Sequence, residues 1–301
     1  MTYTYTAYGL TVSVPFVCQA LPAAPADAVP DVTVAYGTVP MKLAGAVASN
    51  DNWDSGFCWQ AAPGRYLLRG GLRAGRFLVE DGNRVTLDRN SAAEDERLLF
   101  HFLHSVTAAL FRQRGLLVLH ASSANTPAGA IALCGKSRAG KSTTLAAMIQ
   151  NGCTMVSDDL TILRRAANGC TEVLPGTAMM HLWDDAAQGV GLDVSGLSRH
   201  PMRRGKAALQ APGKQCLVPA PLHKIFILEP CTGKNIRLSR LCGTDKFDAL
   251  LESVYGPLFG EEHPGLFTTF TSTAAQTDIY RIKRPEGRWS VDEVVELILN
   301  G

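Results

Sequence analysis

Alternating hydrophobic and polar residues through residues 1–90 predict strands. Tyr5–Val14 alternates in this way, and Asp31–Gly37 contains the similar run VTVAYG. The Pro- and Ala-rich stretch Leu21–Pro30 predicts a loop. Further strand patterns occur at Arg65–Leu68, Arg76–Glu80 and Arg84–Leu87. A hairpin turn is predicted at Asp81-Gly82, between the last two of these strands. Residues 1–90 are therefore expected to form a β-rich region.

Residues 91–113 change to a helical period. Apolar residues recur at i, i+3 and i+4 from Leu98 to Leu110. Ser91 and Glu94 have the spacing of a capping box, which predicts that the helix begins there.

Strand and helix patterns then mix to the end of the chain. Strands are predicted at Leu116–His120, Ala130–Cys134, Thr154–Ser157, Lys224–Glu229, Ile236–Leu241 and Ile279–Ile282. A helix is predicted after the loop Gly135–Lys141, through about Gln150. Helices are also predicted at Thr244–Tyr255 and Ser290–Asn300, the last with a capping-box pattern in Ser290 and Glu293. Residues 91–301 are therefore expected to form an α/β domain, after the β-rich region 1–90.

Composition narrows the functional classes. The chain has 301 residues, 46% of them hydrophobic, and a net charge of +2, which gives no indication of a nucleic-acid or membrane partner. The eight cysteines include no CxxC pair, so a zinc site is not expected. The start MTYTYTAYGL lacks the pattern of a signal peptide, and no apolar run reaches transmembrane length. These features lead us to expect a cytoplasmic protein.

One motif carries a specific chemistry. Residues 135–142, GKSRAGKS, match the phosphate-loop pattern G-x-x-x-x-G-K-[ST] at every fixed position, between a predicted strand and a predicted helix. The glycines allow backbone N–H groups to point at phosphates, Lys141 supplies a positive charge, and Ser142 offers a hydroxyl to Mg²⁺. The expected ligands are ATP and Mg²⁺. The residues predicted to bind ATP are Gly135, Lys136, Ser137, Arg138, Ala139, Gly140, Lys141, Ser142 and Thr143.

Two adjacent carboxylates follow the next predicted strand. In phosphate-loop enzymes an Asp at such a strand end lies close to the metal. Asp158 and Asp159 could divide two tasks, one holding Mg²⁺ and the other accepting the proton of an attacking hydroxyl. His120 ends an earlier predicted strand, and its spacing alone says little.

These residues together resemble the catalytic core of the HPr kinase/phosphorylase family. His120 lies 15 residues before Gly135, and Asp158 lies 17 residues after Lys141, which is similar to the spacing in that family. The resemblance implies a P-loop kinase core of the HPr kinase/phosphoenolpyruvate carboxykinase type. The whole-chain layout, including the late phrase IYRIKRP at Ile279–Pro285, looks more like the HPr-kinase-related serine kinases of ribosomal peptide biosynthesis, lasso peptides among them.

The resemblance also implies roles. Asp158 would be the catalytic base, Asp159 would support the metal together with Ser142, and His120 would support the metal or the base. The acceptor would be a serine hydroxyl of a peptide or protein, and homo-oligomers would be expected because HPr kinases are oligomers. The family's Glu-containing signature after the double Asp has no counterpart in residues 174–185, which argues against HPr as the substrate and leaves a third metal carboxylate unassigned.

The basic segment 199–206 suggests a substrate-binding loop. Arg204 or Lys206 would neutralise charge on the transferring phosphoryl group, unless the loop is an ordinary solvated surface. Two other functions remain open from the residues: a nucleotide-binding regulatory module without transfer activity, and a kinase of a small metabolite.

Overall fold

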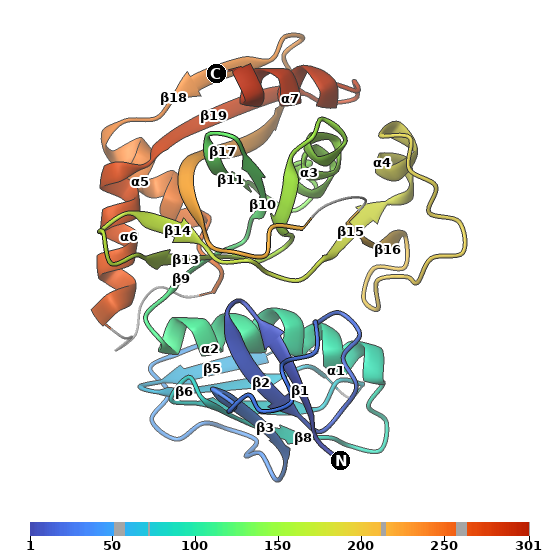
Figure 1. Ribbon diagram of the computed structural model, residues 1–301, viewed down its shortest axis with the longest axis vertical. Coiled ribbons are helices and arrows are strands. Elements are labelled where there is room, and N and C mark those ends of the chain that lie inside the picture. Colours follow the sequence, from blue (N-terminus) through green and yellow to red (C-terminus); the bar gives the residue numbers. More distant parts are fainter. Residues whose placement is uncertain (51–57, 72, 212–214, 257–263, 301) are drawn as a thin grey trace. The chain divides into compact units, whose positions relative to one another are not determined.

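The computed structural model describes residues 1–50, 58–71, 73–211, 215–256 and 264–300 (Figure 1). The chain divides into two compact units. The first contains Met1–Val118 and Gly256–Thr268, and the second contains Leu119–Tyr255 and Thr269–Gly301. The predicted helix at 91–113 thus belongs to the first unit, which differs from the expected boundary after residue 90.

The first unit contains a mixed sheet in the spatial order β1-β2-β3-β8-β7-β6-β5-β4. The strands are β1 Tyr3–Ala7, β2 Leu10–Val14, β3 Val32–Tyr36, β4 Ala48–Asn50, β5 Cys58–Ala62, β6 Arg65–Arg69, β7 Arg76–Glu80 and β8 Arg84–Asp88. The predicted β-rich region is confirmed. The alternating stretch Tyr5–Val14, however, folds back as a hairpin, because Tyr8 and Gly9 both take positive φ (49° and 78°), the backbone of a tight hairpin turn.

Helical residues cover part of this sheet. They form α1 Asp95–His101, a π-helical turn Phe102–Val106 and α2 Thr107–Gln113. Their apolar side chains, including Leu98 and Leu110, share a buried core with strand residues such as Phe77. The predicted capping box is wrong: the helix begins at Asp95, and Glu94 makes no side-chain cap but pairs with Arg73 and Arg97.

The second unit is a mixed α/β fold. Its strands are β9 Leu117–Leu119, which begins in the first unit, β10 Ser122–Thr126, β11 Gly129–Cys134, β12 Thr154–Ser157, β13 Thr161–Arg165, β14 Thr171–Val173, β15 Met179–Trp183, β16 Lys206–Gln210, β17 Ala220–Cys231, β18 Arg237–Arg240 and β19 Asp278–Pro285. Its helices are α3 Lys141–Gln150, α4 Asp184–Gly189, α5 Gly243–Glu252 and α7 Val291–Asn300; α6 Pro264–Gln276 begins in the first unit. None of the described helices is both long and apolar enough to cross a membrane.

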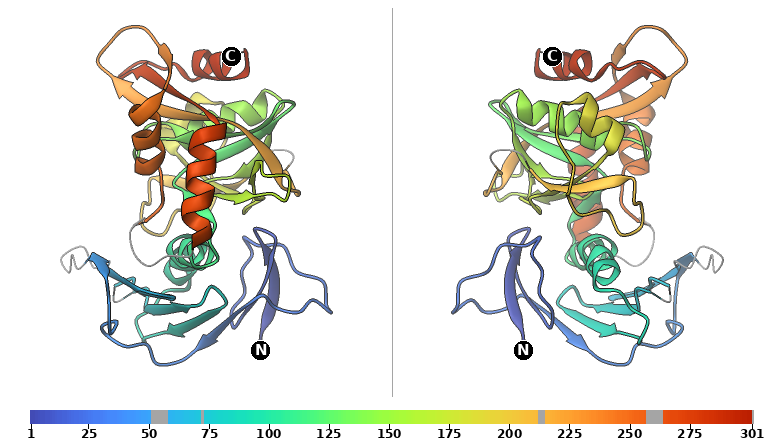
Figure 2. Two further views of the ribbon diagram at one scale, coloured as in Figure 1. Left: turned by 90° about the vertical axis from the view of Figure 1, so that its left-hand side faces the viewer. Right: turned by 90° about the vertical axis from the view of Figure 1, so that its right-hand side faces the viewer.

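Strand β11 lies inside the sheet of this unit. It pairs antiparallel with β10 and parallel with β17, and β17 pairs parallel with β19. Figures 1 and 2 show α3 and α4 on one side of this sheet and α5 on the other. Side chains of β11, α3, β17 and α7 form one buried core, including Leu133, Leu145, Phe226 and Val294. This core fixes the position at which β11 runs into the loop before α3.

Strand β10 was not predicted from the sequence. No strand was expected between His120 and Ala130, but Ser122–Thr126 forms a strand between β11 and β12. Its serines are buried and have polar partners: the hydroxyl groups of Ser123 and Ser157 lie 2.7 Å apart. Buried polar groups with partners can occupy a sheet interior that a hydrophobicity pattern does not reveal.

Candidate functional site

The loop between β11 and α3 has a backbone that requires its glycines. Gly135 has φ of +137°, and a Cβ there would lie 2.4 Å from the carbonyl oxygen of Leu228. Gly140 has φ of +100°, and a Cβ there would lie 3.2 Å from the guanidinium of Arg284. L side chains rarely adopt such backbone angles, so the two fixed glycines of the motif are explained by conformation and by space.

Arg284 of β19 holds the tip of this loop. Its Nε donates to the carbonyl oxygen of Ala139 at 2.9 Å, and one Nη donates to that of Arg138 at 3.4 Å. These two bonds connect the tip of the loop to strand β19. Burial lowers the pKa of Arg284, yet an arginine stays charged at neutral pH.

Lys141 opens helix α3 and lies against the loop. Only 7% of its surface is exposed. Its Nζ donates to the carbonyl oxygens of Gly135 at 2.7 Å and Lys136 at 3.3 Å. Burial lowers the pKa of this ammonium group, while the neighbouring Asp159 acts in the opposite direction. The positive charge is thus held at the mouth of the loop, beside the N-terminus of a helix.

Asp158 is buried directly behind the loop. Its Oδ1 accepts hydrogen bonds from the hydroxyls of Ser142 at 2.9 Å and Ser122 at 2.6 Å, and its Oδ2 accepts from the backbone N–H of His181 at 3.1 Å. Burial and then the charge of Asp159 raise the pKa of Asp158, while the bonds from Ser122 and His181 act against this rise. The side chain is 5% exposed, so it connects the loop serine to the sheet rather than to solvent.

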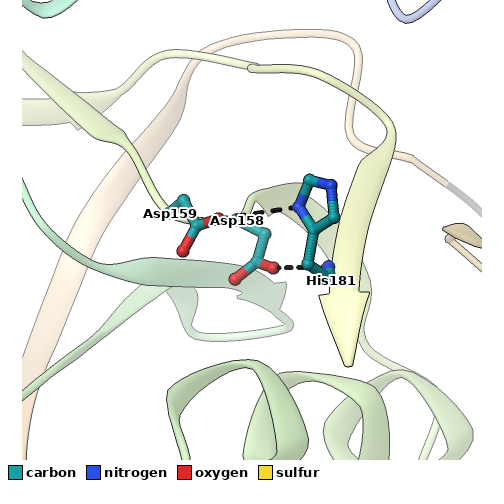
Figure 3. Close-up of side chains that lie close together, drawn as sticks. All are labelled: Asp158, Asp159 and His181. Carbon is teal, nitrogen blue, oxygen red and sulfur yellow. Dashed lines mark hydrogen bonds and ion pairs between the residues drawn. The ribbon is translucent and has the colours of Figure 1, made fainter. Parts of the chain in front are cut away.

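Asp159 points a second carboxylate in a different direction (Figure 3). Its φ is +66°, a left-handed conformation that Asp tolerates better than most residues. One of its oxygens lies 3.6 Å from Nδ1 of His181. Potential ligand atoms of Asp158, Asp159 and His181 all lie within 4.8 Å of one another.

A cavity of about 490 Å³ opens on these groups. Asp159, His120 and His181 line it, whereas Asp158 is not among its lining residues. The cationic side chains around it are Arg138, Lys141, Arg203, Lys206, Arg284 and Arg288. The size is typical of small-molecule sites, and the excess of positive charge favours a polyanionic ligand.

The structure brings most of the predicted site residues together and replaces one. Lys206 lines the cavity, but Arg204 is exposed and is not among the lining residues in the described part of the chain. Its neighbour Arg203 lines the cavity instead and donates to Oγ of Ser137 at 3.1 Å. The reason is a turn fixed by His200, whose Nδ1 accepts the backbone N–H groups of Met202 and Arg203 at 3.0 and 3.1 Å.

His181 was not predicted from the sequence. It lies in the segment in which the sequence offers no metal-binding Glu, on strand β15, whose residues MMHLW alternate in burial. Only the pairing of β15 with β16 and the bond from its backbone to Asp158 show that it reaches the carboxylates. The sequence signal that could have found His181 was a histidine in the middle of a short hydrophobic run, MMHLW.

The donor set fits a hard divalent cation such as Mg²⁺. The hydroxyl of Ser142 and the carboxylate of Asp158 supply the oxygen ligands that Mg²⁺ prefers, and Asp159 offers a further carboxylate nearby. His181 supplies nitrogen, which suits Mg²⁺ less well, so its role toward Asp159 is more readily explained as support of the carboxylate.

Comparisons with known proteins give matches among solved structures alone. No family model and no curated protein match the chain. The structure is similar to that of the HPr(Ser) kinase/phosphatase from Coxiella burnetii, with a TM-score of 0.32 and 12% identity over 61% of this chain and 94% of that chain. At this distance, neither activity nor substrate follows from the likeness.

Proposed function

We propose that the chain is an ATP-dependent kinase that transfers the γ-phosphoryl group to a hydroxyl of a peptide or protein. The observation that carries the proposal is the carboxylate of Asp159, which lines a cationic cavity beside a complete phosphate loop. A protein that only binds Mg·ATP needs a carboxylate for the metal, and Asp158 beside Ser142 would already supply that one. The preference for serine, and a lasso precursor peptide as one acceptor, rest on the resemblance of the motifs.

In this proposal the loop residues hold the triphosphate. Backbone N–H groups of residues 135–143 and the N-terminus of α3 bind its oxygens, and Lys141 leaves the carbonyl oxygens of Gly135 and Lys136 to pair with the β- and γ-phosphates. Ser142 and Asp158 would hold Mg²⁺. That ion supplies charge neutralisation for the β- and γ-phosphates when bound.

We assign the role of the base to Asp159 and the metal to Asp158. This assignment exchanges the two roles that the resemblance implied. Asp159 lines the cavity, whereas Asp158 is buried and accepts the hydroxyl of the loop serine. Asp159 takes the proton of the acceptor hydroxyl while the oxygen of that hydroxyl forms a bond to the γ-phosphorus. The bond between the γ-phosphorus and the β–γ bridging oxygen breaks at the same time. ADP leaves, and the proton is later released to water.

The experiment that tests the function is transfer of label from γ-labelled ATP. Purified protein, Mg²⁺ and a panel of serine-containing peptides should give labelled phosphopeptide, and a panel with Ser replaced by Ala should not. ATP binding without transfer to any peptide, protein or small hydroxyl compound would instead support the regulatory module. Label on a small metabolite alone would support a metabolite kinase.

The two cations of the 199–206 segment that line the cavity should be needed for turnover. Arg203→Ala and Lys206→Ala should each lower kcat by about ten- to a hundredfold, because charge on the transferring group loses a partner. Arg204→Ala is the matched control and should leave kcat within about twofold. Equal losses in all three variants would show that the whole segment, rather than these two side chains, matters.

A further inference from the structure

The cavity has an aromatic side that the phosphate chemistry does not use. Trp289 lies in the connection between β19 and α7, lines the cavity and is 43% exposed. Its six-membered ring packs on Gly189 at the end of α4, where an added Cβ would lie 2.3 Å from two ring carbons. The indole is thus supported on one side by backbone while much of its surface stays open.

The other cavity tryptophan is already covered. The guanidinium carbon of Arg138 lies 4.9 Å from the centroid of the Trp183 ring, and Nζ of Lys206 lies 5.8 Å from it. Cations over an aromatic face occupy the surface on which a flat ligand would stack. Trp289 is therefore the better platform for a planar group.

Neighbours of Trp289 are arranged for a polar ligand. Both carboxylate oxygens of Glu293 fix Arg288, at 2.6 and 3.1 Å from its two Nη atoms. Ser290 is 2% exposed and lines the cavity, and its Oγ has no hydrogen-bond partner among the described residues. Ser290 directly precedes α7, a ten-residue helix whose core face packs with α3 in one buried cluster.

We propose that Trp289 stacks the purine base of the nucleotide and that Ser290 meets its ribose. The inference rests on the proposed binding of a nucleoside triphosphate at the phosphate loop. The phosphates leave that loop past Thr143 and Thr144 at the start of α3, and these two residues share the cavity lining with Val291 and Val294 of α7. A nucleoside attached there lies along the α7 side, while Asp159 and His181 face the γ-phosphate.

The test compares ATP with inorganic tripolyphosphate, which has the phosphates but no nucleoside. Both would be titrated calorimetrically, with Mg²⁺, into the full chain. Trp289→Ala should weaken ATP binding by about tenfold, equivalent to about 1.4 kcal/mol, because base–aromatic stacking is lost. Tripolyphosphate binding should stay within about twofold, which also shows that the variant is folded.

Two further variants separate stacking from other effects. Trp289→Phe should keep most of the ATP affinity, because a phenyl ring still stacks. Gly189→Ala should weaken ATP and spare tripolyphosphate, because the new methyl group must displace the indole.

The possible failures are distinguishable. If the wild type binds ATP no more tightly than tripolyphosphate, or if Trp289→Ala weakens both ligands equally, the base subsite is overturned and the phosphate site stands. If the wild type binds neither ligand, the subsite and the proposed function both fail. If ATP binding depends on Trp289 but no label is transferred, the subsite stands and the kinase proposal fails.

Discussion

Asp159→Asn should abolish most of the phosphoryl transfer and leave Mg·ATP affinity nearly unchanged. The amide cannot accept the acceptor's proton, and removing a positioned base costs about 10²- to 10⁴-fold in rate. Binding should survive because Asp159 lines the cavity beside His181, while the bonds to Ser142 and Ser122 belong to Asp158. Single-turnover rates with γ-labelled ATP and calorimetric ATP affinity would measure the two effects separately.

Two other carboxylates complete that experiment. Asp193→Asn is the control, since Asp193 is exposed and caps the backbone N–H of Ser195 at 2.9 Å, outside the cavity lining. Asp158→Asn should mainly weaken the Mg²⁺-dependent part of ATP binding. The assignment is wrong if Asp159→Asn keeps its rate while Asp158→Asn loses transfer with intact ATP binding, since the base would then be Asp158.

Lys141→Met should lower both ATP affinity and transfer. The methionine side chain nearly fills the same space but brings no charge to the β- and γ-phosphates, and loss of one such preorganised group costs about 10²- to 10³-fold in kcat. The mutant should still fold, because among the described residues the ammonium group donates only to two carbonyl oxygens of the loop. Steady-state kcat and KM, with circular dichroism as a folding check, would show this.

The control for Lys141 is Lys234→Met, at an exposed turn outside the cavity lining. It removes the same charge from the chain and should leave both constants within about twofold. Similar losses in the two variants would mean that net charge, rather than the charge at the loop, governs binding.

The sequence predicted the parts of the site that depend on local patterns. Strand β11 and helix α3 carry clear periods, and the loop between them has residue types that its backbone requires, as Gly135 and Gly140 show. Asp158 and Asp159 end an apolar strand, which placed them beside the loop. These predictions worked because each depends on residues that are close in the chain.

The parts that escaped prediction depend on distant pairs. Strand β10 is polar because Ser122 and Ser123 bond Asp158 and Ser157, about 35 residues away. His181 reaches the carboxylates through the β15–β16 hairpin, and Arg203 rather than Arg204 enters the cavity because His200 fixes a turn. Local periodicity contains no information about such pairings, so the division of roles between the two aspartates could not be derived from it.

The hydrogen bonds from Arg284 to the phosphate loop determine when this loop can form during protein synthesis. The arginine and the carbonyl oxygen that it holds are 145 residues apart in the chain, and β19 is also the parallel partner of β17. Contacts of such long sequence separation form late, because the intervening chain must first be ordered. A nascent polypeptide on the ribosome therefore cannot complete the loop until residue 284 has emerged from the exit tunnel. Nucleotide would then be captured only by chains that have finished assembling this sheet.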